Sequence, residues 1–358
     1  MFILIAFAVA MFFAINIGAS GAAASMGIAY GSGAIKRRRV ALFVSGAGVF
    51  LGGAVGGGEV IKTIGSGIVP SSILSIKLAV IILAGATFTL FISNVLGIPL
   101  STSEVTVGSV IGVGIAYQAV YFGNVIHIVL WWFLVPIIAF ALAFFVGKMI
   151  LWLEKMYPGM NDKKFHKWFV LLVIIAGFLE AVSAGMNNVA NAVGPLVGAG
   201  LLSVFEGMLL GALFVALGAI LLGGKVVETN GKKITNLSLL QGMTVSGTSA
   251  FLVILASVFG IPVPLTQVTT TGILGIGASK SKDNIFKKTI IKKILTVWIV
   301  SPVFSLAVSF GLVKIFLEKD FYTLMALASV FFATVGIMAL MKITKKEKQQ
   351  FHEHGGGI

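Results

Sequence analysis

The sequence predicts an all-α polytopic membrane protein, built from an internal repeat of inverted topology that carries broken or re-entrant helices. Composition is the first observation: 58% of the 358 residues are hydrophobic and only 11% are charged, whereas about a quarter of the residues in a soluble domain are charged. The second is a series of apolar runs such as Phe2–Ile17 and Leu78–Leu96, each long enough to cross about 30 Å of hydrocarbon as a helix. The third is that the chain repeats itself.

Three motifs occur twice, in the same order along the chain. The second copies are displaced from the first by 167, 166 and 163 residues. The matching segments are Gly18–Gly27 with Gly185–Gly194, Gly57–Thr63 with Gly223–Thr229, and Gly97–Thr106 with Gly260–Thr269. Three segments in one order at a nearly constant displacement indicate an internal duplication.

Basic residues are concentrated in a few connections between the apolar runs. Most of the 26 Lys and Arg residues fall in five clusters: Lys36–Arg39, Lys148–Lys167, Lys225–Lys233, Lys280–Lys293 and Lys342–Lys348. Because short loops rich in Lys and Arg stay in the cytoplasm, we expect a multi-pass protein of the plasma membrane with its basic loops and C-terminus on the cytoplasmic side. Membrane lipid is then the partner of these charges. Nucleic acid is excluded, since membrane spans separate the clusters.

The charged connections alternate in opposite ways in the two halves. The connection after the first motif is Lys36–Arg39 in the first half, whereas its counterpart near Leu202–Glu206 has no basic residue. After the third motif the order is reversed, since Tyr117–Asn124 is uncharged and Lys280–Lys293 is densely basic. The halves therefore have opposite topologies, which is the plan of secondary transporters with a binding site at the repeat interface near the bilayer midplane.

We expect five spans in each half and one more at the end. They are 2–17, 40–58, 73–96, 98–116 and 125–152, then 168–185, 204–223, 236–259, 262–278 and 290–315, and finally 320–341. Gly18–Ile35 and Gly185–Leu202 are expected to be re-entrant or broken. The predicted parts are a first repeat (1–155), a cytoplasmic linker (156–167), a second, inverted repeat (168–318), a final transmembrane helix with a basic end (319–348) and a disordered tail (349–358) with His352 and His354.

Small polar residues gather where the motifs recur inside the membrane. Ser101–Ser103 follow Pro99, which stops a preceding helix, and Ser and Thr favour the N-cap of a helix that starts there. Such a helix start directs free amides and the positive end of its dipole at an anion. The predicted oxyanion-binding residues are Ser20, Gly21, Ser101, Thr102, Ser103, Asn187, Asn188, Asn191, Thr266, Gln267 and Thr269. The alternative for any single one of them is that it packs membrane helices together.

These motifs resemble those of the inorganic phosphate transporter (PiT) family over nearly the whole chain. That family carries two copies of Gly-Ala-Asn-Asp-x-Ala-Asn-Ala, matched here by Gly185–Asn191, and two copies of Pro-x-Ser-Thr-Ser/Thr-His/Gln, matched by Pro99–Ser103. The resemblance implies a secondary anion transporter that forms a homodimer. It also implies that the anion contacts the hydroxyls and asparagines of the motifs.

The motif carboxylates of that family are missing from this chain. Gly21 and Asn188 stand where the family has Asp, Glu104 stands where it has His or Gln, and Pro264 and Leu265 replace the second Ser-Thr pair. Phosphate keeps a proton near neutral pH and profits from a carboxylate acceptor, whereas sulfate only accepts hydrogen bonds and is repelled by a carboxylate. The pattern resembles the sulfate permease branch of the family, so sulfate is the expected substrate and phosphate the alternative. If the family's aspartates instead bind sodium, their loss reports altered coupling and not an altered substrate.

Importing a dianion against an inside-negative potential requires coupling, since each charge costs about 2.3 kcal/mol per 100 mV. An acidic residue inside a membrane is energetically costly and therefore suggests a functional role. Glu104 and Glu180 are thus the candidate carriers of a proton or cation. The expected function is alternating-access sulfate import coupled to H⁺ or Na⁺, with no other cofactor. An anion channel and a purely structural membrane protein are the alternatives from other classes. No Ser-His-Asp or metal-ligand pattern is visible in the sequence, so an enzyme is not expected.

Overall fold

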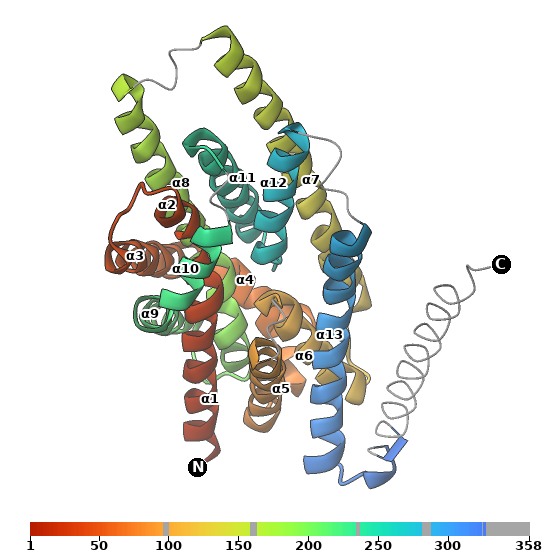
Figure 1. Ribbon diagram of the computed structural model, residues 1–358. Helices are drawn as coiled ribbons and strands as arrows, with labels where there is room; N and C mark the ends of the chain where they lie inside the picture. The colour runs from red at the N-terminus through yellow and green to blue at the C-terminus, as the bar shows by residue number, and fades with distance from the viewer. Residues whose placement is uncertain (96–99, 158–162, 234–236, 281–287, 324, 327–358) are drawn as a thin grey trace, which may run out of the picture. The chain divides into compact units, whose positions relative to one another are not determined.

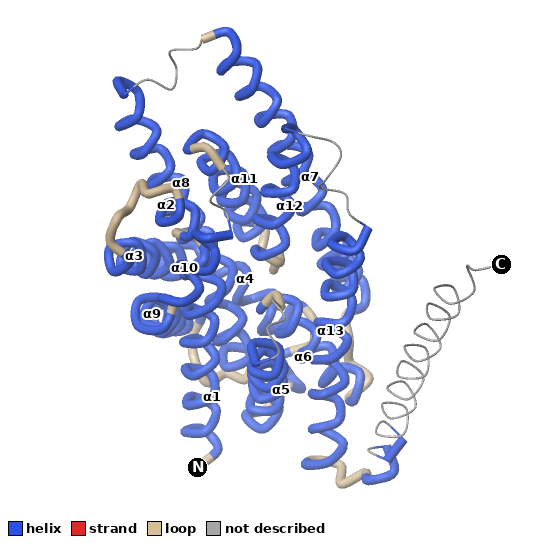
Figure 2. The backbone as a smooth tube through the Cα atoms, viewed as in Figure 1, coloured by secondary structure: helices blue, strands red, loops and turns tan. Residues whose placement is uncertain are grey.

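The computed structural model describes the chain except residues 96–99, 158–162, 234–236, 281–287, 324 and 327–358. The described residues form helices and connecting loops, with no strand among them (Figure 2). The chain divides into two compact units, Met1–Ser309 and Phe310–Ile358. The predicted last span at 320–341 lies mostly outside the described residues, and the tail at 349–358 lies wholly outside them. The predicted domain boundaries remain predictions.

The described residues of the first half form ten helical elements, labelled in part in Figure 1. They are α1 (Phe2–Ile17), η1 (Gly18–Ala22), α2 (Gly27–Gly31), α3 (Arg38–Gly56), α4 (Gly58–Lys62), η2 (Thr63–Gly67), η3 (Ser71–Ile73), α5 (Ile76–Val95), α6 (Thr102–Ala116) and α7 (Phe122–Met156). The second half follows with α8 (Lys163–Gly198), α9 (Val204–Leu222), α10 (Gly224–Lys233), α11 (Leu239–Val258), α12 (Leu265–Lys280) and α13 (Lys288–Phe316).

The order of helices in the first half recurs in the second. Helix α3 begins at residue 38 and ends at 56, and α9 begins at 204 and ends at 222, so both ends are displaced by the 166 residues that separate the second motifs. The segment 58–67 (α4 and η2) corresponds in the same way to α10, 224–233. Helices α5 and α11 are both 20 residues long and are displaced by 163. The duplication read from the sequence thus reappears in the helix boundaries.

Contacts between the halves are exchanged as a twofold relation requires. A Cβ at Gly18 would lie 1.9 Å from the carbonyl oxygen of Val215, and a Cβ at Gly185 would lie 2.1 Å from that of Val49. The contacts are matched, because Gly18 corresponds to Gly185 and Val49 to Val215. A second matched pair joins Gly52 with Val182 and Gly218 with Ile15. A contact that recurs with its partners exchanged is the mark of an isologous interface. The inversion of the repeat with respect to the membrane remains a prediction.

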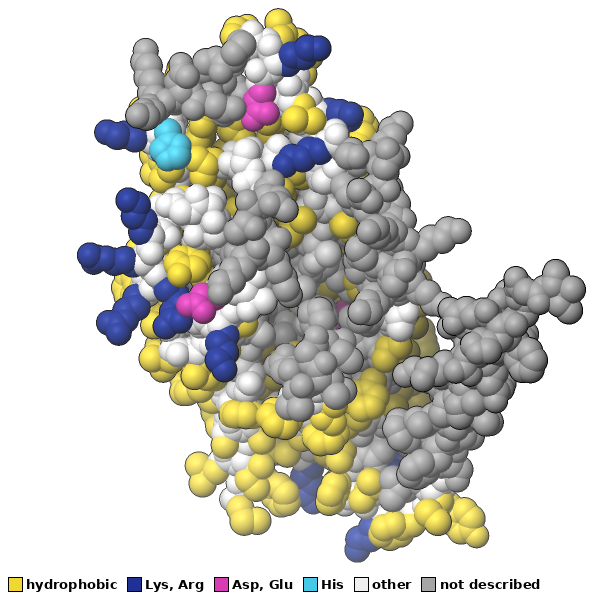
Figure 3. Space-filling view, in the orientation of Figure 1, with side chains coloured by type: hydrophobic (Ala, Val, Ile, Leu, Met, Phe, Trp, Pro, Cys, Tyr) yellow, Lys and Arg dark blue, Asp and Glu magenta, His cyan; other side chains and the backbone are white. Residues whose placement is uncertain are grey.

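Seven helices of the described chain are long and apolar enough to cross a membrane. Helices α7 and α8 have 35 and 36 residues, or about 50 Å at 1.5 Å per residue, which exceeds a hydrocarbon core of about 30 Å. Their adjoining ends carry Lys148, Lys155 and Lys167. In Figure 3, Lys and Arg side chains gather over the upper part of the visible face, whereas its lower half is mainly hydrophobic. This segregation is what a multi-pass membrane protein requires.

The two segments expected to be broken differ from each other. Gly18–Ile35 is broken, since a π-helical turn at Gly18–Ala22 and a turn at 25–26 precede the short helix α2. The hydroxyls of Ser25 and Ser45 both donate to the carbonyl oxygen of Ala22, each at 2.8 Å. These bonds provide partners for a backbone group that a break would leave unpaired.

The prediction of a break at Gly185–Leu202 was wrong. Helix α8 continues through this segment to Gly198, with Pro195 inside it. The asparagines at 187, 188 and 191 lie on one side of the helix, because Asn191 follows Asn187 by four residues and Asn188 by three. Their side chains make hydrogen bonds across that face without any break in the backbone.

Candidate functional site

A buried group of polar side chains joins the start of α6 to the middle of α8. We call Thr102, Ser103, Asn187, Asn188 and Asn191 the asparagine cluster. The hydroxyl of Thr102 donates to Oδ1 of Asn188 and that of Ser103 to Oδ1 of Asn187, both at 3.2 Å. The Asn191 amide donates to the same two hydroxyls, at 3.3 and 3.2 Å. The third motif of one half is thus held against the first motif of the other, as the prediction of a site at the repeat interface requires.

Asn187 uses all of its hydrogen-bonding capacity within the protein. Its amide nitrogen donates to the hydroxyl of Ser257 and the carbonyl oxygen of Ile261, each at 3.1 Å. Its oxygen accepts from the backbone N–H of Val263 at 3.2 Å, besides Ser103. The indole of Trp132 also donates to this connection, at the carbonyl of Pro262, 2.8 Å away. Asn187 therefore fixes the chain that leads into α12 and has no free donor here for an anion.

Asn188 differs, because its amide nitrogen donates to none of the described residues. It faces Gly21, where a Cβ would lie 3.7 Å from this nitrogen. Gly21 and Asn188 occupy the same position in the two copies of the first motif. The missing side chain at Gly21 leaves the Asn188 donor uncovered on that side.

The N-terminus of α6 adds further donors to the same region. Ser101 is the N-cap residue, and its hydroxyl does not cap the helix. The first backbone N–H groups of a helix have no partner inside it, so those of Thr102–Glu104 are available beside the asparagine cluster. This geometry can bind an anion without any cationic side chain.

Glu104 and Gln267 join the starts of α6 and α12. The Gln267 amide donates to Oε1 of Glu104, and the other oxygen of Glu104 has no hydrogen-bond partner. The hydroxyl of Ser301 lies close to the same carboxyl group. Glu104 is only 1% exposed. The ion pairs of the described residues lie at Arg38–Glu228, Lys62–Glu59 and Lys314–Glu318, so no described cation neutralises Glu104.

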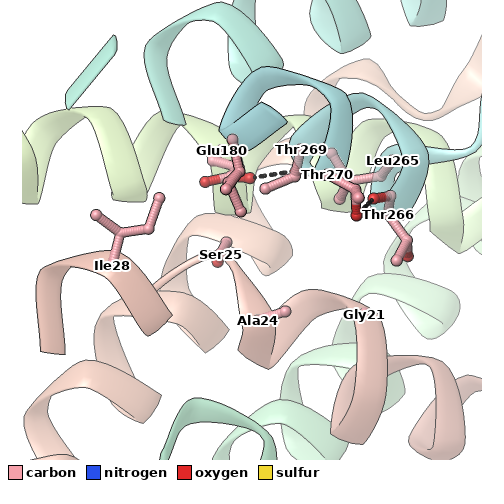
Figure 4. A pocket seen from close by; sticks show the side chains of 10 residues that line it. Gly21, Ala24, Ser25, Ile28, Glu180, Leu265, Thr266, Thr269 and Thr270 are labelled. Carbon is pink, nitrogen blue, oxygen red and sulfur yellow. Dashed lines mark hydrogen bonds between the residues drawn. The ribbon is translucent and has the colours of Figure 1, made fainter. Parts of the chain in front are cut away.

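Glu180 faces a pocket between α8, α12 and the broken segment of the first half (Figure 4). The pocket has a volume of about 110 Å³, which is room for several water molecules. The hydroxyl of Thr269 donates to Oε1 of Glu180 at 2.8 Å, whereas Oε2 is buried without a partner. We call this space the Glu180 pocket; it is lined by Gly21, Ala24, Ser25, Ile28, Glu180, Leu265, Thr266, Thr269, Thr270 and Ile273.

The structure brings all but one of the predicted binding residues into these adjoining groups. Gly21 connects them, since it faces Asn188 and also lines the Glu180 pocket. Ser20 stands apart: its hydroxyl donates to the carbonyl of Asn16 in the preceding turn, at 2.9 Å. Sequence reasoning did not identify Ser246, close to Glu180, or Ser301, close to Glu104. Neither belongs to a repeated motif, so each looked like an ordinary packing residue of a span.

No group of three or more acidic or histidine residues suited to a resident metal occurs in the described part of the chain. The polar groups present are amides, hydroxyls and two separate carboxyls. Together they can surround an anion with neutral donors while a carboxyl group nearby takes up a proton or a small cation.

Comparison with known proteins identifies the family. A model of the phosphate transporter family matches residues 17–309. The chain belongs to the phosphate transporter family. Sulfate permease CysP of Bacillus subtilis is 52% identical to this transporter, over 97% of this chain and 98% of that protein. A putative phosphate permease of Pyrococcus furiosus is 28% identical, over 80% of this chain and 89% of that protein.

A solved structure shares the fold of this phosphate transporter family member. It is a sodium-dependent phosphate transporter that matches with a TM-score of 0.78 and 26% identity, covering 88% of this chain and 100% of that one. The chain is thus an anion transporter with several membrane-spanning helices, related to permeases and not to enzymes. The resemblance read from the motifs is confirmed.

Proposed function

We propose that this transporter imports sulfate by alternating access, coupled to H⁺ or Na⁺. The observation that carries the proposal is the uncovered Asn188 amide beside the free N-terminus of α6, where Gly21 occupies the opposite position. In the family motif both positions carry Asp. The anion would lie between these donors, in contact with Ser101 and Thr102.

The chemistry of the donors favours sulfate over phosphate. A sulfate dianion only accepts hydrogen bonds, and the free donors here are the Asn188 amide and the first backbone N–H groups of α6. The carboxyl groups lie beyond the cluster, where Glu104 is bonded to Gln267 and Glu180 to Thr269. Monohydrogen phosphate also has a proton to donate and would be served less well by these groups. The high identity to a protein named as a sulfate permease agrees with this choice.

The two buried carboxyl groups support coupling to a cation. A buried ionised carboxylate without a partner costs several kcal/mol. Glu104 and Glu180 each keep one oxygen unpartnered and have no described ion pair. Binding a proton or Na⁺ would relieve that cost and also offset the charge of the anion. The sodium dependence named for the structural relative makes Na⁺ a reasonable candidate.

The remaining expectations belong to the same proposal. The basic connections would face the cytoplasm of a plasma-membrane protein, and two copies would form a homodimer. Phosphate remains the second candidate substrate, because relatives from two Pyrococcus species are named as putative phosphate permeases. An anion channel is the candidate from another class.

Uptake into proteoliposomes tests the proposal. Labelled sulfate would be supplied to the purified transporter with excess unlabelled sulfate, phosphate, thiosulfate or molybdate, with and without a sodium or proton gradient. The proposal expects saturable uptake that depends on a cation gradient and is blocked by sulfate more strongly than by phosphate. Stronger block by phosphate would reverse the substrate ranking. Sulfate flux that needs no gradient and does not saturate would favour the channel.

A further inference from the structure

The Glu180 pocket and the asparagine cluster are built from equivalent positions of the two repeats. Gly21 and Ala24, which line the pocket, correspond to Asn188 and Asn191 of the cluster at a displacement of 167 residues. Leu265 and Thr266, also in the pocket, correspond to Thr102 and Ser103 at a displacement of 163. Each group therefore brings the first motif of one half to the third motif of the other.

The two equivalent places differ in whether they are closed. In the cluster, Thr102 and Ser103 meet Asn188 and Asn191 through hydrogen bonds of 3.2–3.3 Å. These side chains are at most 7% exposed. In the Glu180 pocket, the equivalent residues Gly21, Ala24, Leu265 and Thr266 line a space of about 110 Å³ (Figure 4). One twofold-related junction is sealed and the other is open.

The residue types explain which junction is sealed. Asn191 has an amide that bonds to two hydroxyls, whereas its counterpart Ala24 has no polar group. Thr102 donates to Asn188, whereas its counterpart Leu265 cannot donate. Hydrogen bonds hold one junction shut, and the equivalent residues Gly21, Ala24 and Leu265 have no polar side-chain group with which to form them at the other. The sequence therefore favours the arrangement seen here.

Two segments that line the open pocket lead along the chain to basic residues. In the broken first-half segment, the lining residue Ile28 follows Gly21 and precedes the basic residues at 36–39. Along α12, Ile273 lies nearer than Leu265 to Lys280, the last residue of that helix. We expect those ends to be cytoplasmic.

We propose that these two junctions are the gates of one anion pathway: the Glu180 pocket is the gate on the basic side, open here, and the Thr102–Asn188 junction is the opposite gate, shut here. Transport exchanges the two arrangements, so Leu265 closes onto Gly21 when Thr102 parts from Asn188. This rests on the alternating access of the proposed function.

The proposal also gives Glu180 a distinct role. Its counterpart in the first half is Phe13, which is fully buried and apolar. The carboxyl group thus occurs at the basic-side gate alone, where Glu180 lines the pocket and one of its oxygens is buried without a hydrogen-bond partner. Glu180 takes up or releases its proton or sodium ion through this gate, on the same side as the anion is released. Glu104, bonded to Gln267 between the helix starts, does not line this pocket.

Engineered thiols can test the gates, because the chain has no cysteine of its own. One double variant carries Gly21→Cys with Leu265→Cys, and its matched control carries the counterparts Asn188→Cys with Thr102→Cys. Disulfide formation needs Cβ atoms about 4 Å apart. It is measured as the loss of free thiols, which are detected by their reaction with a maleimide of high mass. The proposal expects the control pair to oxidise readily without substrate and the Gly21–Leu265 pair to oxidise slowly.

During turnover the two pairs should respond differently. With anion and coupling cation on both sides of the membrane, oxidation of the Gly21–Leu265 pair should accelerate at least about tenfold, and labelling of an Ile273→Cys single variant from the basic side should fall. An oxidation rate of the Gly21–Leu265 pair that is already fast at rest, or that is unchanged by every anion tested, would overturn the inference. These readouts need no assumption about substrate: acceleration by phosphate and not by sulfate would refute the proposed substrate and leave the gates standing.

Discussion

Gln267 donates a hydrogen bond to Glu104, and these two residues occupy the same position in the two halves of the chain. A residue that meets its own counterpart lies next to the axis that relates the halves. Gly21 and Asn188 form a second pair of counterparts in close approach. The proposed anion site and the candidate coupling carboxyl group thus both lie where the halves meet.

The first prediction concerns coupling through Glu104. The change Glu104→Gln replaces an acid with an amide of the same shape, which takes up no proton under transport conditions and has no negative charge to attract a sodium ion. We expect sulfate uptake to lose its dependence on the cation gradient and its maximal rate to fall at least about tenfold. Uptake that keeps its full response to pH and sodium would remove Glu104 from the coupling mechanism.

The repeat offers a matched control for this change. Exchanging the two residues, Glu104→Gln with Gln267→Glu, keeps one acid and one amide in contact and preserves the side-chain volumes. We expect the exchanged variant to unfold within about 1 kcal/mol of the wild type and to recover part of the gradient dependence. If the exchanged variant lost coupling as fully as Glu104→Gln while keeping its stability, the carboxyl group would be required on α6 and not on α12.

A second prediction tests the close packing of the halves. A Cβ at Gly185 would lie 2.1 Å from the Val49 carbonyl oxygen, and backbones cannot yield as a flexible side chain can. Gly185→Ala should therefore destabilise the protein by about 1–3 kcal/mol, as measured by thermal unfolding in detergent. The control is Gly247→Ala in α11, where nothing lies within 4 Å of the added methyl group; it should be neutral or stabilising by up to about 1 kcal/mol. Equal effects of the two changes would contradict the packing described.

A third prediction separates two adjacent asparagines. Asn187→Ala leaves buried partners at Ser257, Ile261 and Val263 without their bonds, and each such loss costs about 1–3 kcal/mol. We expect a clear fall in the unfolding temperature. Asn188→Ala should change stability much less, because only its oxygen is bonded, yet weaken sulfate binding about tenfold or more. A binding assay and a thermal scan on both variants distinguish these roles, and identical profiles would refute the assignment.

Much of the helical framework was predictable from hydrophobic runs, turn residues and the duplicated motifs. Expected spans such as 204–223 agree with α9 to within one residue. The break in the first half was predictable from its glycines and serines, whereas continuity through Gly185–Leu202 was not. It depends on hydrogen bonds between α8 and segments far away in sequence, and no local pattern records them.

The candidate site was predictable in composition but not in the role of each residue. From the motifs, Asn187 and Asn188 were both predicted to bind the anion. Only the distances show that the Asn187 amide is bonded to the chain leading into α12, whereas the Asn188 amide nitrogen donates to no described residue. Ser246 and Ser301 escaped notice, because an isolated serine in a membrane helix usually packs against a neighbour. The residues that differ between the two junctions, such as Asn191 and Ala24, were visible in the sequence, but only the structure shows that one junction is closed and the other open.

The central claim is that neutral donors at Asn188 and the start of α6 select a fully ionised anion. Equilibrium binding of labelled sulfate to the purified transporter, with phosphate as competitor, tests it most directly when the wild type is compared with Asn188→Asp. Like charges brought together cost several kcal/mol, so the added carboxylate should weaken sulfate binding at least about tenfold and improve the relative affinity for phosphate. Unchanged preference for sulfate over phosphate in Asn188→Asp would contradict the account.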